Sequence, residues 1–162
     1  MTRLLVLFLV ALLAACATVP QPSASAHHEA MSFVAARDAG DDVDAALERA
    51  RAAGTHVLLV MGANWCHDSR ALAGWLATPR FADLIAREYE LVFVDIGMPQ
   101  TGEGRNLDIA QRFGLASLPG TPNVLVLTGE GELVNADTAT SWRNAASRSE
   151  DAIYAELARL AL

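Results

Sequence analysis

The sequence predicts an α/β domain, and three observations support this fold class. First, residues 57–61 form a continuous apolar run of strand length, typical of a strand that is covered on both faces, as in parallel sheets, and 91–95 is the next apolar strand. Second, the segments between such runs carry apolar residues at helical spacing. Third, the elements follow the order helix, strand, helix, helix, strand, helix, strand, strand, helix, with no internal repeat.

The first half of the domain is expected to hold three helices around one strand. The first helix opens at Asp41–Asp42 and ends at Gly54, and strand 57–61 follows it. The second helix runs from about residue 66 to about residue 77. Thr78–Pro79 then starts the third helix, with a cap residue and a proline at the first helical position. The apolar residues expected on the inward faces of these helices are Val43, Ala46, Leu47, Ala50, Leu72, Trp75, Leu76, Phe81, Leu84, Ile85 and Tyr89.

The second half is expected to be richer in turns. A polar Gly/Pro loop over 97–105 follows strand 91–95 and leads into a short helix over about 107–113. Strand 124–127 comes next, and Gly129–Glu130–Gly131 predicts a hairpin turn into a short strand, Leu133–Val134. The motif Ser147-x-x-Glu150 predicts a capping box that opens the last helix.

Composition excludes several classes of protein. The 162 residues suit one domain of ordinary size, and a formal net charge of −7 opposes binding to nucleic acid. The chain has no lysine, which rules out a P-loop phosphate grip and Schiff-base chemistry. Its 2 cysteines cannot form a disulfide-rich scaffold or a four-cysteine zinc site. We therefore expect no cofactor, no metal and no nucleic-acid partner.

The N-terminus predicts export and lipid anchoring. Residues 4–15 carry no charged or polar side chain, and about a dozen residues are too few to span a bilayer. Leu13-Ala14-Ala15-Cys16 resembles the lipobox of bacterial lipoproteins, a family in which the cysteine is lipidated and becomes the first residue. This resemblance implies a signal peptide over 1–15, a lipidated Cys16 with a flexible tether over 16–32, and a domain over 33–162. It also implies attachment to a membrane, facing the periplasm; the absence of an aspartate after Cys16 favours the outer membrane. An ordinary signal peptide that contains a cysteine is the alternative.

One constellation carries chemistry, at the junction of strand 57–61 and the helix that follows it. Cys66 stands in the first turn of this helix, where unpaired backbone N–H groups and the helix dipole favour a thiolate. Ser69 lies three residues later on the same face, so its hydroxyl is expected to donate a hydrogen bond to that thiolate. His67 could stabilise the thiolate or shuttle a proton, and an exposed helix residue is the alternative. Trp65 offers either a flat apolar surface to a peptide or a packed aromatic ring at the strand end.

The motif Trp65-Cys66-x-x-Ser69 after an apolar strand resembles the thioredoxin active site Trp-Cys-x-x-Cys, with the second cysteine replaced. Thr121–Pro122, before strand 124–127, resembles the cis-proline segment of the same family, and the order of elements fits over the whole domain. The resemblance implies a thioredoxin-like α/β fold, with a mixed central sheet and helices on both faces. It also implies that Pro122 follows a cis bond and that the Thr121 backbone meets an extended substrate as an added strand.

Two departures from the family pattern limit the chemistry. The resolving cysteine is replaced by Ser69, so an external thiol has to release any mixed disulfide formed on Cys66. Val60 stands where many thioredoxins carry a buried acid. An ordinary dithiol cycle that reduces client disulfides is therefore excluded.

Three functions remain open from the sequence. In the first, Cys66 exchanges disulfides with protein clients or with glutathione, in isomerisation or deglutathionylation. In the second, the protein is a client-binding, retaining or chaperone-like module, and no turnover occurs. In the third, the fold is degenerate and the thiol has no role. The expected partners are disulfide- or thiol-bearing client proteins, glutathione, and a membrane through the lipid on Cys16.

Overall fold

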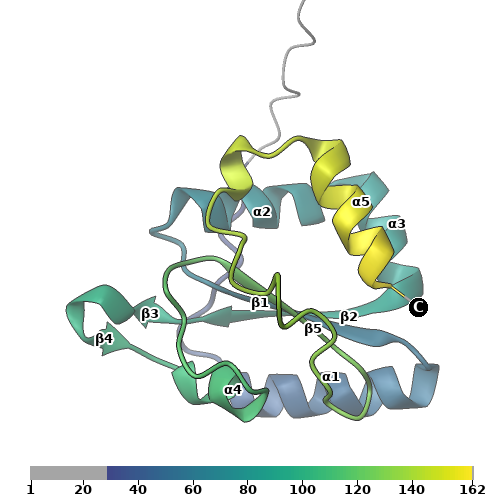
Figure 1. Ribbon diagram of the computed structural model, residues 1–162, viewed down its shortest axis with the longest axis horizontal. Coiled ribbons are helices and arrows are strands. Elements are labelled where there is room, and N and C mark those ends of the chain that lie inside the picture. The colour runs from purple at the N-terminus through teal and green to yellow at the C-terminus, as the bar shows by residue number, and fades with distance from the viewer. Residues whose placement is uncertain (1–28, 162) are drawn as a thin grey trace, which may run out of the picture.

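The computed structural model describes residues 29–161 (Figure 1). The predicted signal segment and Cys16 lie outside the described residues. The helices and strands, in chain order, are α1 Ala39–Ala53, β1 His56–Gly62, α2 His67–Leu76, α3 Pro79–Glu88, β2 Tyr89–Asp95, β3 Gly97–Met98, the 3-10 turn η1 Pro99–Thr101, β4 Glu103–Gly104, α4 Leu107–Arg112, β5 Asn123–Leu127, the 3-10 turn η2 Ala145–Ser147 and α5 Glu150–Leu160.

The central sheet is mixed, as predicted. Its strands stand in the order β2-β1-β5, with β1 parallel to β2 and antiparallel to β5. Figure 1 shows α1 and α4 below the sheet and α2, α3 and α5 above it. Every residue of β1 is buried, because side chains that alternate along the strand enter two different cores. Leu58 and Val60 pack with α2, α3 and α5, whereas Val57, Leu59 and Met61 pack with α1 and α4.

Local signals set most element boundaries where the sequence predicts them. The Asp38 side chain caps α1 by accepting a hydrogen bond from the Asp41 backbone N–H, and Gly54 ends the helix in the left-handed conformation with φ 69°. Pro79 opens α3, and Thr78 stands at its N-cap position. The first helix, strands β1 and β2, and helix α3 are therefore confirmed, although α1 begins at Ala39, two residues before the predicted start at Asp41.

Other local predictions differ from the structure. Tyr89, expected on the inward face of the third helix, is the first residue of β2, where it is buried. The predicted strand at Leu133–Val134 is reduced to a single antiparallel bridge between Leu133 and Leu127, although the hairpin turn is present and Gly131 has φ 86°. The last helix is capped by Ser149, whose hydroxyl accepts from the Ala152 N–H; Ser147 lies in the preceding 3-10 turn and donates to Asn144 instead. The predicted loop 97–105 folds into the two-stranded hairpin β3–β4 around η1.

The segment before α1 is held at the carboxyl end of β1, where it contacts the residues that follow this strand. Phe33 is buried, and its backbone is held on both sides by the Asn64 side chain, at 3.1 Å through its N–H and 2.7 Å through its carbonyl. The Ala30 N–H donates to the Arg70 carbonyl at 3.1 Å. Glu29 and Ala30, which the sequence assigns to the tether, therefore lie against the start of α2. Within residues 29–161 no helix is both long enough and apolar enough to cross a membrane.

Candidate active site

Cys66 lies at the N-terminus of α2, just beyond the carboxyl end of β1. It is the N-cap residue of this helix, with φ −84° and ψ 122°, and its N–H donates to the Ala63 carbonyl at 3.1 Å. The residue is 9% exposed. Its sulfur makes no capping hydrogen bond to the helix. The predicted position is thus confirmed, but the backbone N–H groups of the first turn do not bind the sulfur in this state.

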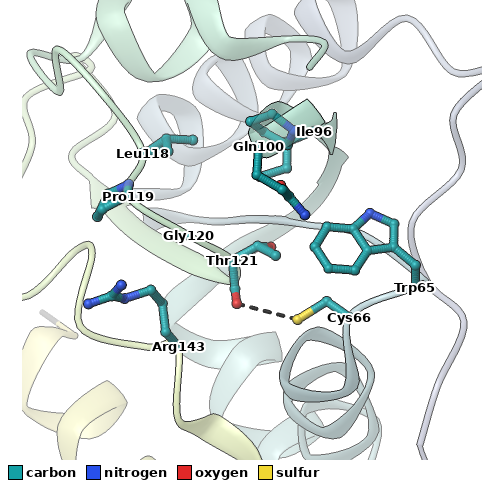
Figure 2. A pocket seen from close by; sticks show the side chains of 10 residues that line it. Trp65, Cys66, Ile96, Gln100, Leu118, Pro119, Gly120, Thr121 and Arg143 are labelled. Carbon is teal, nitrogen blue, oxygen red and sulfur yellow. Dashed lines mark hydrogen bonds between the residues drawn. The ribbon is translucent and has the colours of Figure 1, made fainter. Parts of the chain in front are cut away.

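The thiol instead meets the segment that precedes β5. The Cys66 Sγ–H donates to the Thr121 carbonyl at 3.3 Å, across 55 residues of sequence. The peptide bond between Thr121 and Pro122 is cis, as the resemblance implies. The Asn123 side-chain amide donates to the Gly120 carbonyl at 2.7 Å and so fixes the turn from within. Figure 2 shows the sulfur directed at the Thr121 oxygen.

Ser69 is completely buried and bonds to the same segment, not to the sulfur. Its hydroxyl shares a 3.2 Å hydrogen bond with Thr121 Oγ1 and accepts from the Ala63 N–H at 3.4 Å. These are its hydrogen bonds within the described residues, so the expected bond to the Cys66 thiolate is not formed here. Gly62 makes this arrangement possible, because a Cβ atom there would lie 2.7 Å from Ser69 Oγ. Ser69 therefore positions Thr121 behind the thiol.

His67 contacts the N-terminal segment. Its Nδ1 atom lies 2.5 Å from one oxygen of Glu29, and Arg70 Nε donates to the other oxygen at 2.6 Å. Arg70, followed by His67, holds the pKa of the Glu29 carboxyl below its ordinary value of 4.5. Glu29 was not identified from the sequence, because the polar, unpatterned residues around it are typical of a linker.

Trp65 forms one wall of a cavity of about 410 Å³ that opens beside the thiol (Figure 2). Its indole N–H donates to the Gly97 carbonyl at 2.8 Å, while 46% of the residue remains exposed. The ring is therefore fixed in orientation and still presents an apolar face. The cavity is lined by Trp65, Cys66, Ile96, Pro99, Gln100, Leu118, Pro119, Gly120, Thr121 and Arg143.

Several of these lining residues were not identified from the sequence. Leu118–Pro119 could have been found, since they directly precede Thr121 in the chain. Pro99 and Gln100 come from the segment 97–105, whose relation to the site the sequence left open. Arg143 comes from the long connection before α5. Within residues 29–161, no group of three or more His, Cys, Asp or Glu side chains is placed to hold a metal ion.

Comparison with known proteins identifies the family. Residues 38–129 match a family model described as thioredoxin-like. Among solved structures, the crystal structure of a disulphide isomerase from Xylella fastidiosa Temecula1 matches with a TM-score of 0.73 and 31% sequence identity, covering 81% of this chain and 97% of that one. A search of curated proteins returned no match. The chain belongs to the thioredoxin-like family, and the predicted thioredoxin-like fold is confirmed.

Proposed function

We propose that this protein carries out thiol–disulfide exchange through the single thiol of Cys66. The observation that carries the proposal is the 3.3 Å hydrogen bond from Cys66 Sγ to the Thr121 carbonyl, at the edge of an open apolar cavity. A thiol at a helix N-terminus is well placed for nucleophilic attack once it loses its proton, because the helix dipole stabilises the negative sulfur. The similarity to a disulphide isomerase supports the same chemistry.

The exchange begins when a client disulfide enters the cavity and Cys66 releases its proton to solvent. The thiolate attacks one client sulfur, so that a mixed disulfide forms and the other client sulfur leaves as a thiolate. The bond from Cys66 to the Thr121 carbonyl is lost in this step, and that carbonyl becomes free to accept an N–H from an extended client backbone. The Trp65 ring covers the apolar side of the client beside the new bond.

Release of the client requires a thiol from outside the motif. Ser69 replaces the resolving cysteine, and its hydroxyl cannot attack a disulfide. When a second client thiol attacks the client sulfur of the mixed disulfide, a new client disulfide forms and Cys66 leaves as a thiolate. This route isomerises without net oxidation. When glutathione attacks Cys66 sulfur instead, the client leaves reduced, and a second glutathione frees Cys66 as glutathione disulfide forms.

A retention function is the second candidate, and the same replacement favours it. Without a resolving thiol at position 69, a mixed disulfide on Cys66 persists until an external thiol arrives. A long-lived covalent complex then holds the client in place. The two functions share the first step and differ in the rate of the second.

The proposal also places the protein in the cell envelope. The apolar segment 4–15 followed by Cys16 supports a lipid anchor, and the periplasmic face of the outer membrane is the proposed location. An oxidising compartment would supply client disulfides. Membrane fractionation of the full chain tests this location: Cys16→Ser is expected to move the protein from the membrane fraction to the soluble fraction, and an unchanged distribution would contradict the anchor.

Trapping of clients tests the chemistry. The full chain carrying Cys16→Ser is expected to yield covalent complexes that a reductant dissolves, while the additional change Cys66→Ser abolishes them. Glutathione at millimolar concentration is then added to the isolated complexes. Release within minutes favours the exchange enzyme, whereas complexes that persist for hours favour retention. Failure to recover any Cys66-dependent complex would contradict both.

A further inference from the structure

Arg143 introduces a charge into the wall of the Cys66 cavity. Of the ten residues that line this cavity, Arg143 is the one with a charged side chain, and no aspartate or glutamate stands among them. The chain as a whole has a formal charge of −7. The wall of the cavity beside the Cys66 sulfur therefore carries a positive charge, whereas the protein as a whole is negatively charged.

Arg143 is also without a partner inside the described part of the chain. Most arginines of residues 29–161 bind a carboxylate or a backbone carbonyl: Arg37, Arg49, Arg51, Arg70, Arg80, Arg87, Arg105, Arg112 and Arg148. Arg143 and Arg159 form neither a hydrogen bond nor a salt bridge within these residues, and of the two Arg143 alone lines the cavity. Its five N–H donors are therefore available to a ligand.

The backbone next to the thiol holds the stem of Arg143. A Cβ atom on Gly120 would lie 2.4 Å from Arg143 Cδ, so the arginine packs directly on this glycine. Gly120 precedes Thr121, whose carbonyl accepts the Cys66 hydrogen bond. In Figure 2, Arg143 and Cys66 lie on either side of the Thr121 oxygen. A ligand whose sulfur meets Cys66 can thus place a neighbouring group at the guanidinium.

We propose that Arg143 is a specificity residue that selects thiols and disulfides bearing a carboxylate close to the sulfur. This inference rests on the proposed exchange at Cys66 and names its substrate class. A guanidinium recognises a carboxylate through paired, charge-assisted hydrogen bonds. Gln100, on the opposite wall in Figure 2, offers an amide to the remaining polar groups of the ligand. The cavity volume of about 410 Å³ falls within the range of roughly 300–1,000 Å³ that small-ligand sites occupy.

The test uses three disulfides of similar length but different charge. These are the disulfide of mercaptopropionate, which carries carboxylates, the neutral disulfide of mercaptoethanol, and cystamine, which carries ammonium groups. Each reacts with the Cys66 thiolate to give a mixed disulfide and one free thiolate, and mass spectrometry of the full chain with Cys16→Ser gives the rate. In Arg143→Gln, the ratio of the carboxylate rate to the neutral rate is expected to fall about three- to fivefold, the upper part of the range of an exposed ion pair. The preference is expected to weaken at high salt.

Arg159→Gln is the matched control. It removes the same charge from an exposed, unpaired arginine that does not line the cavity, so its ratio is expected to stay at the wild-type value. Gly120→Ala is a second variant, because it keeps the charge but displaces the Arg143 side chain from its contact with residue 120. The ratio of the carboxylate rate to the neutral rate is expected to fall in this variant too. Equal ratios in Arg143→Gln and wild type, or equal falls in both arginine variants, would overturn the inference.

The outcome also separates this inference from the proposed function. Reaction with the neutral disulfide at wild-type Cys66, without any charge preference, would refute the role of Arg143 and leave the exchange standing. Absence of reaction with all three disulfides would refute the exchange itself. The disulfides of glutathione and of a Cys-Asp peptide then distinguish a small thiol from an acidic client segment. The disulfide that resembles the natural substrate is expected to show the larger fall in reaction rate in Arg143→Gln.

Discussion

Ser69→Ala tests the position of the serine that replaces the resolving cysteine. In the structure the Ser69 hydroxyl bonds to Thr121 Oγ1 at 3.2 Å and to the Ala63 N–H at 3.4 Å. The side chain is completely buried, so water cannot take over these bonds in the variant. The change therefore leaves one backbone donor and one hydroxyl without their partner behind the Cys66 thiol.

The size of the effect follows from these two bonds. A typical intramolecular hydrogen bond contributes about 0.5–1.5 kcal/mol to stability, and both bonds here are long. We expect Ser69→Ala to lower the free energy of unfolding by about 1–2 kcal/mol. Ser141→Ala is the control, since Ser141 is exposed and its hydroxyl donates to the Thr138 carbonyl at 2.8 Å. Its effect is expected to stay within about 0.5 kcal/mol.

Urea unfolding measures the stability, and alkylation of Cys66 against pH measures the chemistry. Both use the full chain with Cys16→Ser, so that one thiol reports. Because Ser69 bonds to Thr121 rather than to the sulfur, the pH profile of alkylation is expected to be unchanged in Ser69→Ala. A profile displaced to higher pH with unchanged stability would refute this reasoning and restore the bond to the thiolate that the sequence motif predicts.

Three further predictions follow from other contacts. Gly62→Ala places a methyl group 2.6 Å from the Phe33 ring, and the overpacking is expected to lower stability by about 1–3 kcal/mol in urea unfolding. Arg70 lowers the pKa of Glu29, so this carboxyl stabilises the attached N-terminal segment above about pH 4.5; protection of backbone amides there from hydrogen exchange is expected to fall as the pH drops through the lowered value. Tyr89→Phe removes a 2.6 Å bond from the phenol to a carbonyl of α5, and a loss of about 1 kcal/mol is expected in thermal unfolding.

Controls distinguish each of these effects from a general loss of stability. Gly40→Ala within α1 meets only an ordinary contact at 3.4 Å, so it is expected to raise stability where Gly62→Ala lowers it. Glu29→Gln is expected to remove the acid dependence of amide protection, and a dependence that persists would assign it to another group. A thermal midpoint of Tyr89→Phe equal to that of the wild type would contradict a net contribution from the phenol bond.

Much of the fold could be predicted because its signals are local. Gly54 ends α1 because a glycine adopts the left-handed conformation at low cost. Pro79 opens α3 because the N–H of the first helical residue, which proline lacks, has no partner within the helix. The sequence offers two serines as the cap of α5 and its motif favours Ser147, but the preceding 3-10 turn contains Ser147 and Ser149 caps the helix. The extent of the strand after Gly131 depends on its pairing with β5, which no local pattern contains.

The same division holds for the candidate site. Residue order alone predicts that a thiol, Cys66, follows a buried strand at the start of a helix, and that a Thr-Pro pair precedes a later strand. Residue 69 is a serine, so this position supplies no thiol that could resolve a mixed disulfide. These are properties of residue type and order, which local backbone geometry converts directly into position.

The partners of these groups are set by the packing of the folded chain. Ser69 binds Thr121 across 52 residues, His67 contacts Glu29, and Arg143 packs on Gly120. Each contact joins segments that are distant in the sequence and come together only in the folded chain. Hydrogen-bond and ion-pair partners depend on distances of a few ångströms after packing, so no local pattern in the sequence predicts them.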